Sequence, residues 1–240
     1  MLTPTAIQQD GDRHPAGVAR LSRRRLLWGA AGLVGASRAL AEEALRHETA
    51  EDALGPFYPL SLPKDQDFDL SLVAGHKTRA LGQLLYVSGR VVNPRGEPIA
   101  NAVLEIWQAN AAGRYMHPGD TGDAPLDPNF QGYARIRSGA DGSYLIKTVQ
   151  PGNYGPRTRH IHFDVRGKRS RLITQMYFEG DPLIPICPIL TTIPDKDALD
   201  RLVAPLDLNA SAPFDSLAYR FDIVLRGQRS TYFENRTAGN

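Results

Sequence analysis

The side chains with the clearest capacity for chemistry are two histidines separated by a single residue. His160 and His162 flank Ile161, and Phe163 and Val165 continue the run. Because the neighbours are β-branched or aromatic, the run predicts a β-strand, in which side chains two apart point to the same face. His160 and His162 can therefore bind one metal ion while Ile161 and Phe163 face a core. Such strands also occur in zinc and copper sites, so the metal depends on the remaining ligands.

Two tyrosines supply candidate ligands of a different kind. Tyr154 follows a turn at residues 151–153, and Tyr115 comes soon after a strand that is expected to end near Gln108. A phenolate is a hard, anionic oxygen donor, and two phenolates with two neutral imidazoles favour a trivalent ion such as Fe(III) over Zn(II) or Cu(I). Taken alone, each tyrosine is more typical of a packing or surface residue. The motifs around them decide between these interpretations.

Those motifs resemble the non-haem Fe(III) site of the intradiol ring-cleaving dioxygenases. The stretches that carry the resemblance near the ligands are Trp107-Gln108-Ala109-Asn110, Gly113-Arg114-Tyr115 and His160-Ile161-His162-Phe163. Residues 126–130 (LDPNF), 172–185 (LITQMYFEGDPLIP) and 217–227 (LAYRFDIVLRG) extend it. The resemblance covers about Gly55 to Asn235, and within the family it is greatest to the iron-binding β subunits of the protocatechuate-cleaving enzymes.

This resemblance implies one non-haem Fe(III) ion with four protein ligands. Tyr115 and His160 would be equatorial ligands, and Tyr154 and His162 would be axial, with water or hydroxide in the fifth position. Tyr154 would be the ligand that leaves when the substrate chelates the iron.

The resemblance also implies the reaction and two more catalytic residues besides Tyr154. Arg157 would stabilise negative charge that develops on the substrate ring, and Gln175 would line the pocket where oxygen enters. One such well-placed donor lowers a barrier by about 3 kcal/mol. The expected reaction is cleavage of a catechol by O2 between its two hydroxylated carbons, giving a cis,cis-muconate. Protocatechuate is the first expected substrate, followed by catechol, substituted catechols and hydroxyquinol.

One stretch departs from the pattern of the protocatechuate enzymes. Only residues 155–159 separate Tyr154 from His160, whereas those enzymes carry a longer, tryptophan-containing loop that helps to shape the substrate pocket. The shorter segment is more similar to exported members of the family, and it leaves the reaction better supported than the identity of the substrate.

Two alternatives compete with an iron dioxygenase. The first is a non-catalytic β-sandwich binding module of the cell envelope, in which the four candidate ligands would be incidental. The second is a zinc or copper site without dioxygenase activity. A zinc protein would be colourless and a copper protein blue, whereas tyrosinate bound to Fe(III) gives a burgundy to red-brown colour.

Other polar and aromatic residues are expected to have structural roles. His117 precedes a Pro-Gly-Asp turn and is expected to be exposed in a loop. Turns rich in proline and glycine use carboxylates for local hydrogen bonds, which is the role expected of Asp127 and Asp181. Tyr133 and Tyr177 are expected to be packing residues.

The elements that must position these residues are mostly short strands. Strands are predicted at residues 86–92, 102–108, 143–147, 160–165, 172–178 and 219–225, separated by Gly- and Pro-containing turns. This pattern predicts a mostly β fold, an antiparallel β-sandwich with little helix. The one good helix candidate is residues 195–203, and residues 42–84 predict an irregular N-terminal arm ahead of a catalytic domain at residues 85–240.

The beginning of the chain has a different character. Ser22-Arg23-Arg24-Arg25 precedes an apolar, Gly- and Ala-rich run, and Ala39-Leu40-Ala41 supplies a small-x-small cleavage pattern. Residues 1–41 therefore predict a cleaved twin-arginine-type signal and a periplasmic protein. That export route carries folded proteins, which suits a cofactor inserted in the cytoplasm.

Composition narrows the partners. The formal net charge of the 240-residue chain is only +2, without a basic patch interleaved with aromatics after the leader, so nucleic acid is not an expected partner. Cys187 is the only cysteine, which excludes an intrachain disulfide. The expected partners are a catecholic small molecule and O2, with no membrane span after cleavage, and either copies of the same chain or an α-subunit-like chain.

Overall fold

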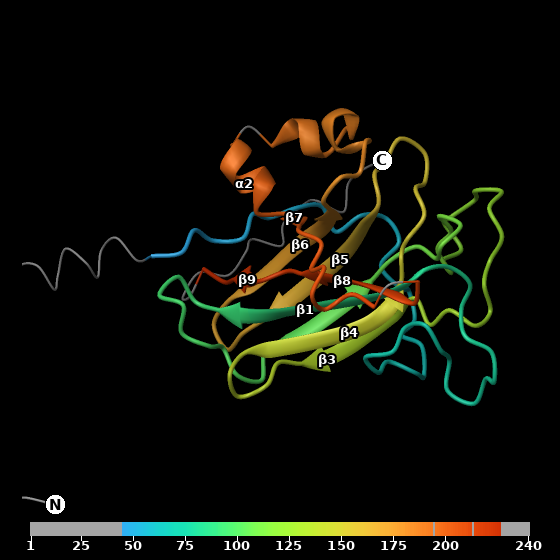
Figure 1. Cartoon of the computed structure of the whole chain (residues 1–240), viewed down its shortest axis with the longest axis horizontal. Coiled ribbons are helices and arrows are strands. Elements are labelled where there is room, and N and C mark those ends of the chain that lie inside the picture. Colours follow the sequence, from blue (N-terminus) through green and yellow to red (C-terminus); the bar gives the residue numbers. More distant parts are fainter. Residues whose placement is uncertain (1–44, 194, 213, 227–240) are drawn as a thin grey trace, which may run out of the picture. The chain divides into compact units, whose positions relative to one another are not determined.

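β-strands make up nearly all the regular structure of the described residues. The computed structural model describes residues 45–193, 195–212 and 214–226 (Figure 1), so the signal predicted at residues 1–41 lies outside them. The strands form two sheets, which confirms the mostly β class. Both sheets are mixed, because some strand pairs are parallel where the sequence predicted an antiparallel sandwich.

The larger sheet has five strands in the order β3-β2-β5-β6-β7. Its strands are β2 (Val103–Trp107), β3 (Tyr133–Arg137), β5 (His160–Arg166), β6 (Arg171–Phe178) and β7 (Val203–Ala204). Only the β6–β7 pair is parallel. The predicted strands at residues 102–108, 160–165 and 172–178 are confirmed, while β3 was not predicted.

The smaller sheet is built around its longest strand, β1. Its strands are β1 (Leu84–Val92), β4 (Ser143–Val149), β8 (Ser216–Arg220) and β9 (Ile223–Val224). β1 pairs with β4 antiparallel and with β8 and β9 parallel. The single strand predicted at residues 219–225 is thus divided in two, because the Asp222 carboxylate accepts a hydrogen bond from the Arg90 backbone N–H between β8 and β9 at 3.0 Å.

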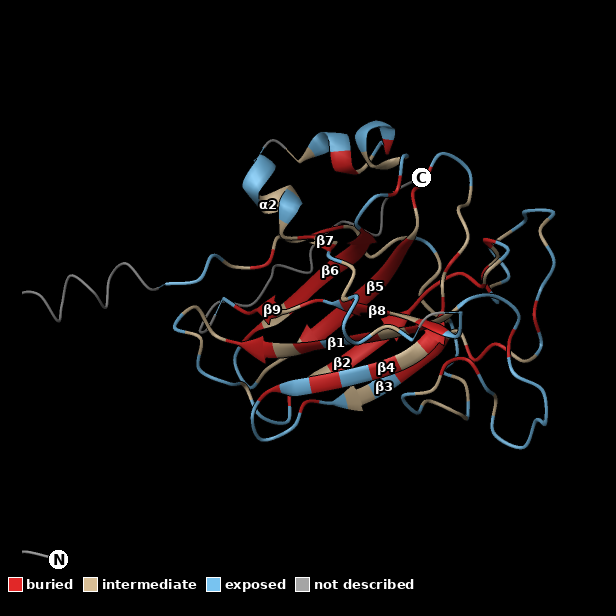
Figure 2. Cartoon of the chain, in the orientation of Figure 1, coloured by how far each residue is buried: buried red, intermediate tan, exposed pale blue. Residues whose placement is uncertain are grey.

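One hydrophobic core joins the two sheets. Ile161 and Phe163 of β5 belong to the same buried cluster as Leu85 and Val87 of β1 and Ile146 of β4. Figure 2 shows how continuous this burial is along β5 and β6. Since alternate side chains of β5 point to opposite faces, the two histidines lie on the face turned away from this core, yet they too are buried.

Helix is scarce, as predicted. α2 (Lys196–Asp200) begins after Asp195, whose side chain accepts a hydrogen bond from the Asp197 N–H at 3.0 Å. It ends before the predicted limit of residue 203, because Val203 pairs with Tyr177 in the five-stranded sheet. Two short 3₁₀ turns precede it, at Ile184–Ile186 and Leu190–Thr192. None of the described helices is long and apolar enough to cross a membrane.

The N-terminal arm is irregular, as predicted, but part of it is a core element. Thr49 and Asp52 are buried. The Asp52 N–H donates to the Ile173 carbonyl at 3.0 Å, and the Thr174 hydroxyl donates to the Ala50 carbonyl at 2.8 Å. The arm therefore runs beside β6 and covers the face of the sheet that carries the histidines.

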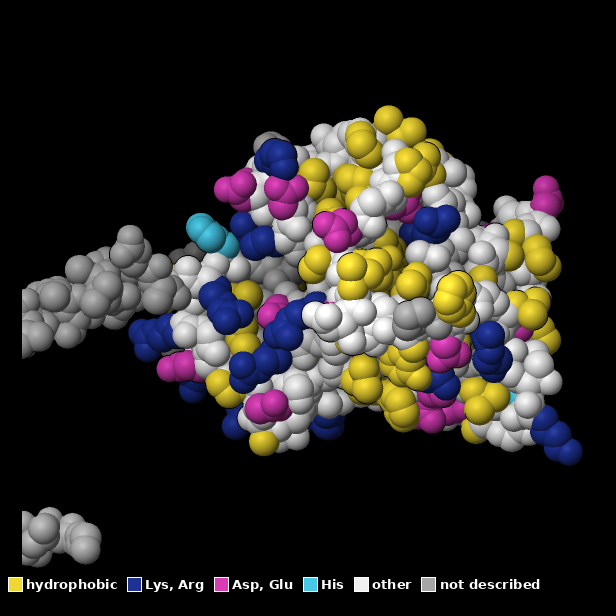
Figure 3. All heavy atoms as spheres, viewed as in Figure 1, with side chains coloured by type: hydrophobic (Ala, Val, Ile, Leu, Met, Phe, Trp, Pro, Cys, Tyr) yellow, Lys and Arg dark blue, Asp and Glu magenta, His cyan; other side chains and the backbone are white. Residues whose placement is uncertain are grey.

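The exposed surface carries charges of both signs. On the face in Figure 3, basic side chains gather on the left, acidic ones are scattered, and apolar ones lie mostly over the middle and the right. Ion pairs among the described residues include Lys147 with Asp69 at 2.8 Å and Arg226 with Glu48 at 2.8 Å.

Candidate metal centre

The four predicted ligands converge on one place. The ring centroids of Tyr115 and Tyr154 are 5.4 Å apart, those of Tyr154 and His160 are 5.5 Å apart, and those of His160 and His162 are 4.8 Å apart. The Tyr115 hydroxyl lies 3.5 Å from Nε2 of His160. Both histidines come from β5, while the tyrosines come from the loops that follow β2 and β4. Residues distant in sequence thus form one cluster of two phenols and two imidazoles.

The loops that carry the two tyrosines are packed directly against each other. Gly113 has a φ of +82°, and a Cβ there would lie 2.1 Å from the Asn153 carbonyl oxygen, so only glycine fits. The Gly152 N–H donates to the Asn110 carbonyl at 2.9 Å. This close approach fixes the separation of Tyr115 and Tyr154.

Backbone contacts select the free nitrogen of one histidine. Nδ1 of His160 lies 2.7 Å from the Thr158 carbonyl oxygen. Because a carbonyl can only accept, Nδ1 carries the proton and Nε2 presents its lone pair toward Tyr115. A histidine ligand oriented in this way through its second nitrogen is typical of metal sites.

Burial keeps the two imidazoles of the cluster neutral and therefore able to bind a metal ion. Burial and the nearby Arg157 lower the pKa of His160 to about 3, and burial, His160 and Arg157 hold the pKa of His162 well below its usual value, so both imidazoles are neutral. Burial raises the pKa of Tyr115 and Tyr154. A bound metal ion reverses this last effect by stabilising the phenolates. Two neutral imidazoles and two potential phenolates suit Fe(III), so the residues present fit the ion that the family resemblance implies.

Aromatic rings and the arm enclose the cluster. The centroid of the Phe57 ring lies 4.7 Å from that of Tyr115 and 5.7 Å from that of Tyr154. Gly55, with a φ of +74°, passes so close to His162 that a Cβ there would lie 2.9 Å from Cε1 of the imidazole. The arm thus forms one wall of the site, a role that its turn-rich sequence did not indicate.

Arg157 and Gln175 lie together beside the ligands. Nη2 of Arg157 donates to Oε1 of Gln175 at 2.6 Å, and Nε2 of Gln175 donates to the Ala53 carbonyl at 2.7 Å. Tyr177, which was expected only to pack, donates to Asp52 at 2.7 Å and lies 3.4 Å from Nη2 of Arg157. The two-residue spacing of Gln175 and Tyr177 on β6 was a usable signal for Tyr177, because it places both on one face. Nothing in the sequence pointed to Asp52.

The carboxylates expected to be structural accept backbone hydrogen bonds in their turns, Asp127 from the Asn129 N–H at 2.9 Å and Asp181 from the Leu183 N–H at 3.0 Å. Asp127 also accepts from the Leu81 N–H of the arm at 2.7 Å. His117 was predicted to be exposed but is half-buried, because its ring packs against Phe57 with the centroids 5.6 Å apart while its Nδ1 accepts from the Gly119 N–H at 3.0 Å. Cys187 is fully buried. Among the residues that the structure describes, no group of three or more His, Cys, Asp or Glu side chains could hold a metal ion.

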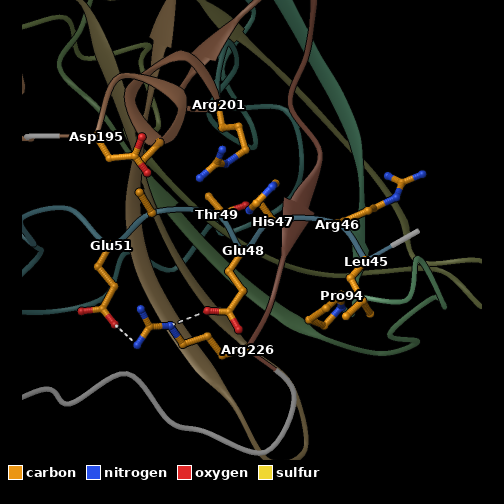
Figure 4. A pocket seen from close by; sticks show the side chains of 12 residues that line it. Leu45, Arg46, His47, Glu48, Thr49, Glu51, Pro94, Asp195, Arg201 and Arg226 are labelled. Atoms are coloured by element: carbon orange, nitrogen blue, oxygen red, sulfur yellow. Dashed lines mark ion pairs between the residues drawn. The ribbon is translucent and has the colours of Figure 1, made fainter. Parts of the chain in front are cut away.

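The hollow in Figure 4 is a separate feature at the start of the arm, and none of the four predicted ligands lines it. Arg226 pairs there with Glu48 at 2.8 Å and with Glu51 at 3.5 Å. Thr49 adds a backbone hydrogen bond to the Val224 carbonyl at 3.1 Å. These contacts fasten the beginning of the arm that continues over the metal centre.

Comparison with known proteins identifies the family. A family model described as dioxygenase matches residues 54–227, a range that includes all four predicted ligands together with Arg157 and Gln175. The protocatechuate 3,4-dioxygenase beta chain of Burkholderia cepacia is 42% identical over 196 residues, which span 78% of this chain and 83% of that protein. This chain belongs to the intradiol ring-cleaving dioxygenase family.

Two further relatives of this dioxygenase are more distant. The protocatechuate 3,4-dioxygenase alpha chain of the same organism is 28% identical over 199 residues, spanning 78% of this chain and 96% of that protein. Among solved structures, the dioxygenase domain of a dioxygenase and carbohydrate-binding protein fusion from Streptomyces sp. SirexAA-E has a TM-score of 0.58. It is 28% identical, and the match covers 75% of this chain and 98% of that domain. The predicted dioxygenase activity and family are thereby confirmed.

Proposed function

We propose that this dioxygenase binds one non-haem Fe(III) ion through Tyr115, Tyr154, His160 and His162 and cleaves a catechol with O2 to a cis,cis-muconate. The observation that carries the proposal is the convergence of two phenols and two neutral imidazoles on one buried point. Iron bound there would supply a Lewis acid that makes the bound catechol reactive toward O2.

The residues around the ligands have separate tasks in this proposal. Tyr154 is more exposed than Tyr115, which suits the ligand that leaves and takes up a substrate hydroxyl proton on its phenolic oxygen. The buried guanidinium of Arg157 faces negative charge that develops on the ring, and the Gln175 amide lines the same pocket. Phe57 and the arm exclude water from the opposite wall.

Protocatechuate is the first candidate substrate. It is favoured by the 42% identity to a protocatechuate 3,4-dioxygenase beta chain. Catechol is the second candidate, because the Acinetobacter lwoffii protein named catechol 1,2-dioxygenase 1 is 39% identical over 119 residues, although these span only 42% of this chain. The short stretch at residues 155–159, which lies between two proposed ligands, bears on that choice.

A visible absorption spectrum tests the iron site and ranks the substrates. The purified protein is expected to show a tyrosinate-to-iron band, which shifts to longer wavelength when protocatechuate or catechol is added without oxygen. Admitting oxygen should then consume the substrate with loss of the shifted band. Iron-loaded protein without any band would exclude the tyrosines as ligands, and a blue or colourless protein without dioxygenase activity would favour copper or zinc.

We also propose a partner and a location. A relative named as an alpha chain that matches the same part of this chain supports either a homo-oligomer or pairing with an α-subunit-like chain. Residues 1–41 support export to the periplasm through the twin-arginine route. Replacing Arg23, Arg24 and Arg25 together with lysines should leave the precursor in the cytoplasm, as measured by cell fractionation, and unchanged export would contradict this route.

A further inference from the structure

We propose that Tyr177 and Asp52 are positioning residues that hold the guanidinium of Arg157 at the reacting end of the pocket. This inference rests on the proposed function, because it assigns Arg157 its role there. It adds two residues from elements without metal ligands, since Tyr177 lies on β6 and Asp52 lies on the N-terminal arm. The reason lies in one buried chain of hydrogen bonds.

The orientation of Gln175 is fixed from both ends. One end of its amide lies 2.7 Å from the Ala53 carbonyl oxygen, and because that oxygen can only accept, this end must be the Nε2 donor. At the other end, Oε1 accepts from Nη2 of Arg157 at 2.6 Å. A flipped amide would place two acceptors together at one end and two donors together at the other. The Gln175 oxygen is therefore committed to the guanidinium.

The single hydroxyl proton of Tyr177 then decides what its oxygen can do. Asp52 Oδ2 lies 2.7 Å away and Gln175 Oε1 lies 2.9 Å away, so two acceptors compete for one proton. The carboxylate is the stronger acceptor and the closer one. With its proton on the Asp52 side, the Tyr177 oxygen turns its lone pairs toward Nη2 of Arg157, at 3.4 Å.

Two oxygens thus converge on one nitrogen of Arg157, and a buried carboxylate polarises one of them. Arg157, Gln175, Tyr177 and Asp52 are all buried. Nε of Arg157 has no hydrogen-bond partner among the described residues, so the contacts of Nη2, together with an interaction with the Cys187 side chain, set the direction of the guanidinium. Asp52 also balances the buried cation through Tyr177, which reduces the cost of keeping Arg157 away from water.

The competing explanation is that the chain of hydrogen bonds only fastens the arm to the sheet. In that case removing the Tyr177 hydroxyl would lower stability without a specific effect on the chemical step. A positioning role instead predicts a loss in kcat while substrate binding and iron content stay intact, because a misplaced catalytic group slows the reaction more than it weakens binding.

The first test compares Tyr177→Phe with Tyr144→Phe. Tyr144 is a matched control because it is also a buried tyrosine, and its hydroxyl donates to the Phe221 carbonyl at 2.6 Å, within the core between the sheets. Tyr177→Phe is expected to lower kcat about 10- to 100-fold. Its iron content, its tyrosinate-to-iron band and the Kd for protocatechuate added without oxygen should stay near those of the wild type. Tyr144→Phe should lose stability but keep kcat.

A double-mutant cycle gives the second test. If Tyr177 acts through Arg157, Tyr177→Phe should have little further effect on kcat in an Arg157→Lys background, because the guanidinium that it positions is gone. Asp52→Asn, which keeps the shape of the side chain and removes its charge, should lower kcat in the same direction as Tyr177→Phe with bound iron retained. It serves as the second variant if Tyr177→Phe does not fold.

The outcomes separate the two proposals. A wild-type enzyme without the charge-transfer band or turnover would remove the proposed function. If the wild type is active, three results would overturn the positioning role alone. Tyr177→Phe could keep full kcat, or its kcat could fall no further than that of Tyr144→Phe. The third result is a double variant in which the fold-losses in kcat of Tyr177→Phe and Arg157→Lys multiply fully.

Discussion

The indole ring of Trp107 lies parallel to the imidazole of His162, with the ring centroids 4.8 Å apart and the planes 5° apart. The two residues face each other directly across the β2–β5 pair. The Tyr58 ring meets the indole edge-on at 5.0 Å, and the Tyr58 hydroxyl donates to Glu105 at 2.9 Å. A side chain of the neighbouring strand and a residue of the arm together restrict the orientation of one proposed ligand.

Trp107→Phe should weaken this support without removing the fold. We expect the free energy of unfolding to fall by about 1–3 kcal/mol and iron to be lost to a chelator roughly 10-fold faster, the effect of removing support from behind a ligand. Phe163→Leu is the control, because Phe163 lies on the core face of β5. It should cost similar stability and leave the rate of iron loss unchanged. Equal rates of iron loss in both variants would contradict this prediction.

His162→Ala should abolish iron retention and colour, because it removes one of four proposed ligands. Iron content by elemental analysis and the visible spectrum measure this. His76→Ala is the matched control, since His76 is exposed and its imidazole pairs with the Asn129 side chain at 2.9 Å rather than with a proposed ligand. Full iron content together with normal turnover in His162→Ala would take His162 out of the site.

Tyr154→Phe should keep its iron but change colour and slow turnover, because the departing ligand and proton acceptor is lost. Tyr115→Phe should retain less iron than Tyr154→Phe, since Tyr115 is almost fully buried beside Nε2 of His160. Iron content, the visible spectrum and kcat are measured for both variants. An unchanged spectrum and rate in Tyr154→Phe would remove that residue from the proposed ligands.

Gly55→Ala should harm the metal centre, whereas Gly75→Ala should not. Both glycines have a φ in the left-handed region, +74° and +85°, so alanine costs each about 1–2 kcal/mol of backbone strain. Only at Gly55 does the added Cβ meet a proposed ligand, 2.9 Å from Cε1 of His162, while nothing lies within 4 Å at Gly75. Gly55→Ala should therefore melt at a lower temperature than Gly75→Ala, and iron retention and kcat should fall in Gly55→Ala alone. Normal iron retention and kcat in Gly55→Ala would contradict this prediction, because they would show that the arm can move away from His162 without affecting the metal centre.

Local sequence was sufficient for the strands whose residues alternate or are uniformly apolar. β5 and β6 were predicted within one residue at each end, because their branched and aromatic side chains favour strand on both faces. β3 was missed since Arg135 and Arg137 interrupt its apolar pattern and Glu105 across the sheet pairs with Arg135 at 3.5 Å. Such pairing between strands is not visible in a local window of sequence.

The candidate site was predictable where a motif carries it and unpredictable where only the fold does. His160 and His162 lie on one predicted strand, whose two-residue spacing already indicates a shared face, and Arg157 was assigned through the family resemblance of the same segment. Asp52 and Gly55 come from an irregular arm and reach the site through backbone contacts with β6 and a close approach to His162. No periodicity marks such residues, because their positions depend on tertiary packing.

Because the side chains of β5 alternate between two faces, substitution of its residues is restricted for two separate reasons, one for each face. The volume of the core restricts which residues can replace Ile161 and Phe163. The geometry of the cluster on the other face restricts replacements of His160 and His162. Substitutions at arm residues beside the cluster, such as Gly55 and Phe57, can therefore alter the site without disturbing the interior packing, to which the arm contributes Leu70 and Ala80. Lengthening β5 by one residue before Ile161 would have the opposite effect, because it would exchange the two faces and damage the interior and the cluster together.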